Sequence, residues 1–527
     1  MKKMLPRFLV ALITYLLMQA ILYTKIRLVF AIPEQICPSY IAIRTLAAVF
    51  GVTLLTLLYT AIDLIIHKDQ NFLSYIPYFV FYLGIMGVFF LLTYPGIFKG
   101  DEFYVLRSAL SFQLSPAQSG LTSLFYICCL LFVPSMAAIT GIQLLGICTA
   151  FSYIMKHLRE LYPTRLVWIV SIPCLLLPVI DGNLFTLRST PVGWLFTLML
   201  FRIFFLYKKH SAPKTGLSDA VFFAVTGGLL CAWRNEYVYL LVLLPLALLF
   251  LRLCDLKKAL LLMLALLLCF RLWNIPNRIA QDGCNKYPIS LVLNPIANIF
   301  NQEHIDGPTA YEDILTINEL VDVRLLRESA SVCNISQYWN IPDILPQKQL
   351  SRFMAASLRI ILYNFDDFLK YRFQTFAYTN GFYKDRINHP GGEMVSGILD
   401  LVYYGEDYKT KFILVNPILS RQLRHKTIEF LACRHYVQGE ITTNILLPIL
   451  YDCVPVIRLL TVCMLAALFR KKYWFCCLAL LCMTQLILIF LTAPAMFFMY
   501  YFCFYLSGYL LCALFVLDTR SQRREQP

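Results

Sequence analysis

Long apolar segments alternate with short polar ones along most of this 527-residue chain. A helix that crosses a bilayer needs about 20 mostly apolar residues, fewer when it is short or tilted. The segments that qualify are residues 8–25, 42–66, 72–93, 137–156, 165–181, 190–207, 217–233, 236–252, 258–274, 451–469, 473–491 and 495–517. We therefore predict an all-α polytopic membrane protein with about 12 transmembrane helices.

One further apolar segment, residues 121–133, is too short to join this set. It holds 13 residues and stops at Pro134. A segment of that length fits an interfacial or buried helix better than a membrane span. We expect it to belong to a first large outer loop, residues 94–136, that carries interfacial helices.

Basic residues gather in alternate loops and set the predicted orientation. Cytoplasmic loops carry an excess of Lys and Arg. With the basic N-terminus placed in the cytoplasm, the inner segments hold 19 basic and 6 acidic residues. If residues 121–133 crossed the membrane, every later basic loop would lie on the outer side, so this orientation requires that they do not cross. The pattern predicts that both termini are cytoplasmic, and the short Lys-Lys N-terminus favours a bacterial plasma (inner) membrane.

Residues 275–443 differ from the rest of the chain. They contain 17 basic and 18 acidic residues and no apolar run long enough to span a bilayer. We expect one soluble extracytoplasmic domain of mixed or mainly α structure, with helices near 310–330 and 347–373. It would separate the first nine membrane helices (1–274) from the last three (444–527).

The amino-acid composition supports a membrane protein and argues against a nucleic-acid partner. Hydrophobic residues make up 59% of the chain and charged residues 15%, which excludes an ordinary soluble domain and a disordered chain. The net charge of +15 lies in the hydrophobic part of the chain, so it does not indicate a nucleic-acid partner. The 18 cysteines include no CxxC pair, and no HExxH motif occurs, so no metal site is predicted.

Ionisable residues gather at the predicted outer ends of the spans. They are Asp101, Glu102, Arg107, Asp181, Arg188, Arg234, Glu236, Arg271, Asp452 and Arg458. Each one alone is explained by snorkelling at a helix end. Taken together, the arginines in this set oppose the positive-inside bias. Paired acids or an anionic ligand should therefore hold them at the outer face.

Asp101 and Glu102 follow a Pro95-Gly96 turn at the end of the third predicted span. Neighbouring carboxylates repel each other, so one of them can have a raised pKa and act as a base. Solvated loop acids are the alternative interpretation of the same two residues.

Four segments resemble the GT-C superfamily of membrane glycosyltransferases, which includes aminoarabinose transferase and protein O-mannosyltransferases. Residues 94–109 (YPGIFKGDEFYVLRSA) look like the acidic motif of the first outer loop, and residues 115–133 look like its interfacial helices. Residues 186–201 and 231–243 are similar to segments of uncharacterised bacterial members. The chain departs from the pattern in its two extra N-terminal spans and in the position of the large domain.

The resemblance implies transfer of a sugar from a polyprenyl-phosphate-type donor to a lipid, glycan or protein acceptor on the outer face. Asp101 would be the catalytic base that deprotonates or orients the acceptor hydroxyl, and Glu102 is the second candidate for this role. Cations would bind the donor phosphate at the membrane surface. The substrate-binding candidates are Arg107, Arg188, Arg234, Glu236 and Arg271. Some members of the class use a divalent cation, and the Asp-Glu pair does not decide this for the present chain.

Two other classes of function compete with this interpretation. A transporter or flippase for a lipid-linked or anionic substrate would use the same outer arginines. A non-catalytic envelope assembly protein would use the outer domain to bind a partner. The transferase hypothesis predicts that Asp101, Arg188, Arg234 and Glu236 line one cavity beneath residues 275–443.

Overall fold

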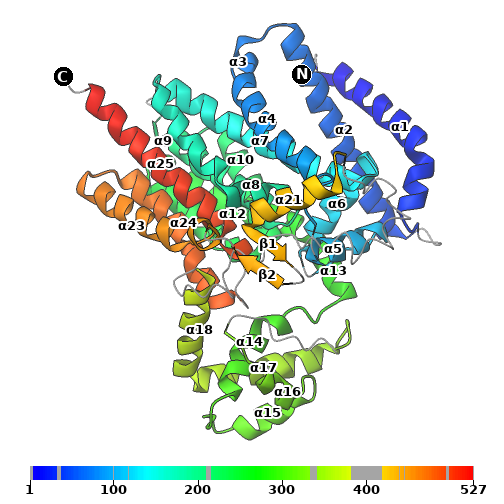
Figure 1. The fold of residues 1–527 in the computed structure, drawn as a ribbon, viewed down its shortest axis with the longest axis vertical. Helices are drawn as coiled ribbons and strands as arrows, with labels where there is room; N and C mark the ends of the chain where they lie inside the picture. Colours follow the sequence, from blue (N-terminus) through cyan, green and yellow to red (C-terminus); the bar gives the residue numbers. More distant parts are fainter. Residues whose placement is uncertain are drawn as a thin grey trace.

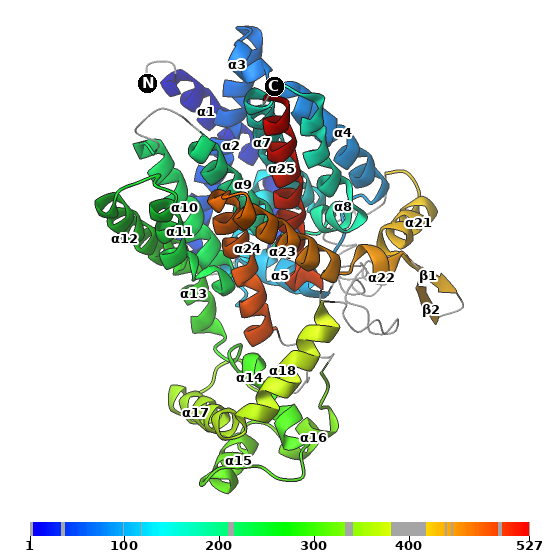
Figure 2. The ribbon, with the colours of Figure 1, turned by 90° about the vertical axis from the view of Figure 1, so that its left-hand side faces the viewer.

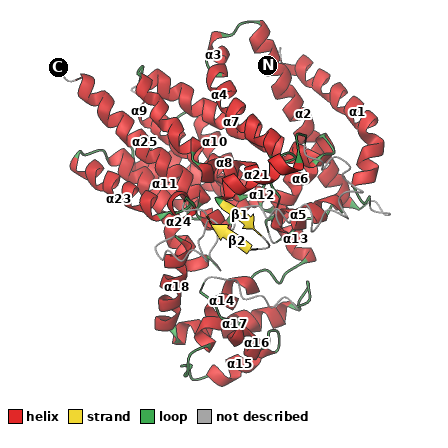
Figure 3. Cartoon of the chain, viewed as in Figure 1, coloured by secondary structure: helices red, strands yellow, loops and turns green. Residues whose placement is uncertain are grey.

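The computed structural model describes residues 4–32, 37–98, 100–116, 118–208, 215–332, 341–380, 418–437, 440–443, 446–493 and 498–525. These residues form mostly helices, with one antiparallel hairpin of β1 (Arg434–Val437) and β2 (Glu440–Thr443) (Figure 3). The predicted class, a helical multi-pass membrane protein, is confirmed in this coarse form by the length and apolar character of the helices.

Eight helices within the described residues are long and apolar enough to cross a membrane. They are α1 (Met4–Val29), α2 (Pro38–Ile66), α3 with α4 (Gln70–Leu73 and Ile76–Leu92), α7 (Met136–Leu161), α9 (Ser189–Lys208), α12 with α13 (Leu256–Trp273 and Ile275–Gly283), α24 (Tyr473–Thr492) and α25 (Phe502–Glu525). The bent pair η1 (Arg165–Leu175) and α8 (Leu177–Leu184) would make a ninth. Its 62° bend lies beside Pro173 and Pro178, which lack the N–H that a continuous helix needs.

The three other predicted spans are also helices, but shorter ones. They are α10 (Leu217–Trp233), α11 (Leu240–Phe250) preceded by the 3-10 turn η2 (Asn235–Tyr237), and α23 (Val454–Phe469). At a rise of 1.5 Å per residue, α10 and α23 are about 25 Å long, which is less than the roughly 30 Å of a bilayer core. The count of twelve therefore stays a prediction.

The helices differ in how much of their apolar surface the protein covers. Only 11% of the apolar window of α1 is buried, 17% of that of α2 and 22% of that of α12, whereas the figure is 78% for both α9 and α25. Exposed apolar surface of this extent is unfavourable in water and costs nothing in lipid. The bundle therefore has a central core around α9 and α25 and peripheral helices with faces suited to lipid (Figure 1).

Two short helices occupy the loop that follows α4. They are α5 (Gly100–Leu110) and α6 (Gly120–Phe132). As expected, the apolar segment near 121–133 forms a helix of only 13 residues, too short to span. Most of α6 is buried, because it packs against α2, α5 and α7.

A buried carboxylate in the C-terminal half of α25 joins three helices. Asp518 of α25 has no exposed surface and pairs with Lys208 of α9 at 2.5 Å and with Lys472 at 2.7 Å. The Tyr162 hydroxyl donates a hydrogen bond to the same carboxylate. These contacts fix the far end of α25 relative to α7 and α9.

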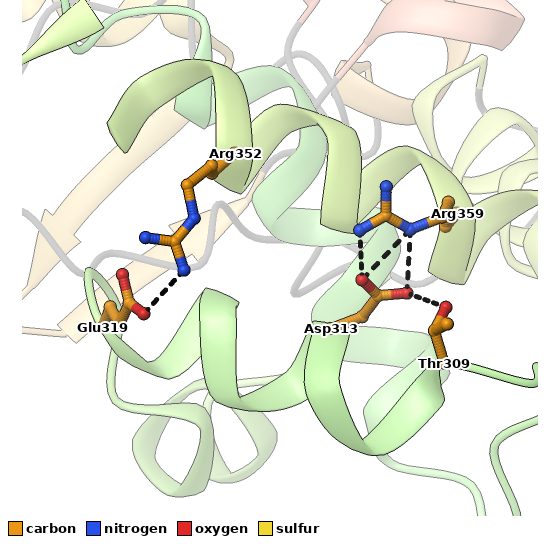
Figure 4. A network of polar contacts seen from close by, with 5 residues as sticks. All are labelled: Thr309, Asp313, Glu319, Arg352 and Arg359. Atoms are coloured by element: carbon orange, nitrogen blue, oxygen red, sulfur yellow. Dashed lines mark hydrogen bonds and ion pairs between the residues drawn. The ribbon is translucent and has the colours of Figure 1, made fainter. Parts of the chain in front are cut away.

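Residues 289–332 and 341–379 form a small helical body at the end of the molecule opposite the described termini (Figures 1 and 2). Its helices are α14 (Ile289–Phe300), α15 (Ala310–Asn318), α16 (Val323–Glu328), α17 (Gln347–Tyr363) and α18 (Phe365–Thr379). They enclose their own core, which includes Leu293, Ile317 and Phe353. Figure 4 shows polar contacts between its helices, where Arg359 of α17 binds Asp313 of α15 and Arg352 binds Glu319.

The predicted helices in this part of the chain are each divided in two. The stretch 310–330 forms α15 and α16, and the stretch 347–373 forms α17 and α18. Asn364 lies at the second break, where its side chain bonds the backbone of Asp306 at 2.8 and 2.9 Å.

The later part of the 275–443 segment lies against the membrane helices. There α21 (Arg421–Ala432) packs against α4 and α8, followed by the β1–β2 hairpin and α22 (Leu447–Leu450). Residues 381–417, which connect α18 to this part, lie outside the described residues.

Candidate functional site

The turn that follows α4 determines where the acidic pair lies. Gly96 has φ +115, and a Cβ placed there would lie 2.2 Å from Thr140 Oγ1, so the position requires glycine. The Thr140 hydroxyl donates to the Pro95 carbonyl at 3.2 Å, and the Ile97 N–H donates to the Leu184 carbonyl at 3.2 Å. The Pro95-Gly96 turn is thereby tied to α7 and to the end of α8.

Asp101 and Glu102 begin α5 and point in different directions. Successive helical residues are about 100° apart around the axis, so neighbours cannot share a face. Glu102 is fully buried, within electrostatic reach of the Tyr126 hydroxyl of α6. Asp101 is exposed, and its Oδ2 accepts a hydrogen bond from Gln118 Nε2 at 2.7 Å. Only the Asp101 carboxylate is therefore accessible to a substrate in this arrangement.

Asn277, at the start of α13, joins the beginning of α6 to the end of α10. Its Oδ1 accepts from the Ser119 hydroxyl at 2.7 Å and from the Gly120 N–H at 2.8 Å. Its Nδ2 donates to the Ala232 carbonyl at 2.7 Å. A Cβ on Gly120 would lie 2.3 Å from the Pro276 carbonyl oxygen, so glycine permits this close approach.

A short series of hydrogen bonds runs from Asp101 toward the end of α10. Gln118 binds Asp101, and the Gln118 carbonyl accepts from the Thr122 hydroxyl at 2.6 Å. Thr122 Oγ1 in turn accepts from Trp233 Nε1 at 2.9 Å. Trp233 immediately precedes Arg234. These hydrogen bonds therefore connect the helix that carries Asp101 with the turn that carries Arg234.

Arg234 and Glu236 lie in the turn between α10 and α11. Arg234 is only 5% exposed, and its Nη2 lies 3.3 Å from Glu236 Oε1. The Arg234 Nε is buried and has no hydrogen-bond acceptor among the described residues. Arg188 also lies within electrostatic reach of Glu236. A buried guanidinium with an unused donor is suited to an anionic ligand.

Tyr500 lies beside Arg234, and sequence analysis missed it. It belongs to the 3-10 turn η4 (Phe498–Tyr500), where the last span was predicted to have already begun. The Arg234 guanidinium carbon lies 6.0 Å from the Tyr500 ring centroid, and Arg234 Nη1 donates to the Met499 carbonyl at 3.4 Å. Tyr500 is also within electrostatic reach of Asp101 and Glu236.

No protein-family model, curated protein or solved structure matches the chain. The arrangement of its own residues is therefore the basis for any functional conclusion.

The remaining sequence candidates lie elsewhere or serve other contacts. Arg107 of α5 and Arg271 at the end of α12 are exposed and lie outside the contacts described above. Asp181 is buried and accepts a hydrogen bond from the Tyr451 hydroxyl at 3.1 Å. Asp452 Oδ1 accepts from the Val454 N–H at 2.7 Å, at the start of α23.

Within the described residues, no group of three or more His, Cys, Asp or Glu side chains is placed to hold a metal ion. Whether Asp101, Arg188, Arg234 and Glu236 line one cavity stays a prediction.

Proposed function

We propose that this protein is a GT-C-type membrane glycosyltransferase that moves a sugar from a polyprenyl-phosphate-type donor to an acceptor hydroxyl at the outer membrane face. The proposal rests mainly on one observation, the series of hydrogen bonds that connects Asp101, through Gln118 and Thr122, to Trp233, which directly precedes Arg234 and its partner Glu236. An accessible carboxylate and a buried cation are the two groups that such a transfer requires.

Asp101 acts as the base in this proposal. It takes the proton of the acceptor hydroxyl as the acceptor oxygen bonds to the anomeric carbon of the sugar. The bond between that carbon and the phosphate oxygen breaks, and its electron pair leaves with the polyprenyl phosphate. Gln118 orients Asp101 through the 2.7 Å hydrogen bond. The burial of Glu102 favours Asp101 over its neighbour for this role.

Arg234 binds the donor phosphate, with Arg188 nearby. Burial strengthens the attraction between a guanidinium and a phosphate because the surrounding dielectric constant is low. Glu236 holds Arg234 in place through the 3.3 Å contact and balances its charge while the site is empty of donor. The polyprenyl tail would lie along the apolar faces of the neighbouring helices.

The orientation belongs to the same proposal. We place about twelve spans in the plasma (inner) membrane, both termini in the cytoplasm, and residues 275–443 outside as a soluble domain. The position of the α14–α17 body opposite the described chain ends supports this placement (Figures 1 and 2). The 19 basic residues of the inner segments support it as well.

The test is transfer of labelled sugar from a polyprenyl-phosphate donor by the purified full-length protein, together with the mass of the lipid that copurifies with it. We expect the Asp101→Asn variant to lose about 100-fold or more in kcat, as for loss of a general base. The matched control is Asp255→Asn, which changes an exposed carboxylate at the start of α12 and should leave kcat unchanged. Full activity in Asp101→Asn would remove Asp101 as the base.

A transporter or flippase is the second candidate, because the bent pair η1 and α8 resembles the broken helices at transporter binding sites. Proteoliposomes with a labelled polyprenyl phosphate in one leaflet distinguish the two functions. Movement of the label between leaflets without any sugar transfer would favour the transporter.

A further inference from the structure

Arg372, on α18 of the outer helical body, binds the end of a membrane helix. Its Nε donates to the Phe490 carbonyl at 2.6 Å, its Nη1 to the Ala493 carbonyl at 2.8 Å and its Nη2 to the Ile489 carbonyl at 3.2 Å. The side chain is only 3% exposed. All three nitrogens of one guanidinium are therefore used at the C-terminal end of α24.

The chemistry of a helix end explains this contact. The last carbonyls of a helix have no intrahelical donor, and the helix dipole makes that end negative. Arg372 has no carboxylate partner in the described part of the chain, and burial lowers its pKa to about 10. Burying a cation is costly unless its N–H donors are hydrogen-bonded, and here the three carbonyls at the end of α24 accept those bonds.

Arg424, on α21, makes the same type of contact at another membrane helix. Its Nε donates to the Thr93 carbonyl at 3.2 Å, and its Nη2 donates to the Gly96 carbonyl at 3.1 Å. Thr93 is the C-terminal residue that caps α4, as Ala493 is for α24. Two arginines from the segment 275–443 thus each cap the end of one candidate span.

The two capped helix ends lead directly into the candidate site. The chain after α4 carries Asp101, and the chain after α24 carries Tyr500. The end of α18 makes one contact next to Tyr500 and another with the start of α23. The Thr379 hydroxyl lies 2.7 Å from that of Tyr501, and the Cys453 N–H donates to the Asn380 carbonyl at 3.0 Å.

We propose that Arg372 and Arg424 are positioning residues, which hold the ends of α24 and α4 and thereby fix Tyr500 and Asp101 relative to each other. The outer segment then acts as a brace for the membrane-embedded site. The catalytic consequence of this inference rests on the proposed function, but the brace itself can be tested without any activity.

The direct test is amide hydrogen exchange in the full-length protein in nanodiscs. Arg372→Met removes all three donors and keeps a long apolar side chain. We expect faster exchange in peptides that cover residues 486–501 and unchanged exchange in α9. The milder variant Arg372→Lys keeps the positive charge but loses the planar guanidinium that reaches all three carbonyls. Hydrogen exchange in the same peptides should therefore be intermediate.

Arg359→Met is the matched control, since Arg359 lies in the same helical body but pairs with Asp313 inside it (Figure 4). It should raise exchange in α15 and α17 and leave residues 486–501 unchanged. Unchanged exchange of residues 486–501 in Arg372→Met would overturn the brace. An equal rise throughout the bundle would also overturn it, because that result indicates general destabilisation.

A kinetic measurement then separates positioning from stability. We expect Arg372→Met to lower kcat by about 100-fold at saturating donor, since a displacement of about 1 Å can cost that much. The donor KM should change by less than about threefold, because Arg234 remains. If the wild-type protein transfers no sugar, the proposed function fails and the exchange measurement still decides the brace. Normal kcat in a variant with faster exchange would refute the catalytic consequence.

Discussion

Asn277 offers a sharp test of how the candidate site is assembled, because one side chain joins three segments. Replacing it by Ala removes the hydrogen bonds to the Ser119 hydroxyl, the Gly120 N–H and the Ala232 carbonyl. A typical intramolecular hydrogen bond contributes about 1 kcal/mol net, and a buried partner left unpaired costs more. Since Asn277 is partly exposed, water can replace some of these contacts. We expect a loss of about 2–3 kcal/mol in the free energy of unfolding.

The Asn277→Asp variant provides the matched comparison. Its carboxylate keeps both acceptor contacts near the N-terminus of α6, where a negative charge is favourable. It loses the two contacts that Asn277 Nδ2 donates, to the Ala232 carbonyl and to Asn274 Oδ1, so the expected cost is about 1–2 kcal/mol.

The free energies would be measured by reversible unfolding in mixed detergent micelles, with hydrogen exchange of residues 118–122 as the local probe. We expect faster exchange in Asn277→Ala than in Asn277→Asp. A loss below about 0.5 kcal/mol in Asn277→Ala, the range of ordinary surface substitutions, would refute the reasoning. So would a greater loss in the Asp variant than in the Ala variant.

Three further changes test other parts of the structure. Gly96→Ala places a methyl group 2.2 Å from Thr140 Oγ1 at φ +115, and thermal unfolding should show a loss of about 1–3 kcal/mol. Arg234→Met should weaken binding of a polyprenyl phosphate by more than about 10-fold, with Arg234→Lys intermediate, and equal affinity in equilibrium dialysis would contradict this role. Asp518→Asn leaves two largely buried lysines without a counter-ion, so the free energy of unfolding measured in detergent micelles should fall by about 3–5 kcal/mol, and an unchanged value would contradict this role of the ion pairs.

Asp101 and Glu102 show where sequence interpretation reaches its limit. Both residues are acidic, adjacent and equally placed after a Pro-Gly turn, so the sequence could not choose between them. The helical conformation of α5 separates them, because one face packs against α6 and the other does not. The choice between two adjacent carboxylates therefore depends on what packs against the helix.

The sequence by itself determined the class of the protein and most of its long helices. The length of an apolar run and the position of prolines are local properties, so α1, α2, α7, α9 and α12 could be predicted within a few residues. The sequence also indicated the short helix α6 and the charged turn at Arg234.

Only the tertiary structure decided which residues meet. Asn277 and Ser119 are 158 positions apart, and Arg424 and Thr93 are 331 apart. Contacts of this kind depend on how helices pack, and one chain read in order carries no signal for them. For the same reason the sequence did not reveal that Tyr500 precedes the last helix, or that two arginines of residues 275–443 cap the helices that lead into the site.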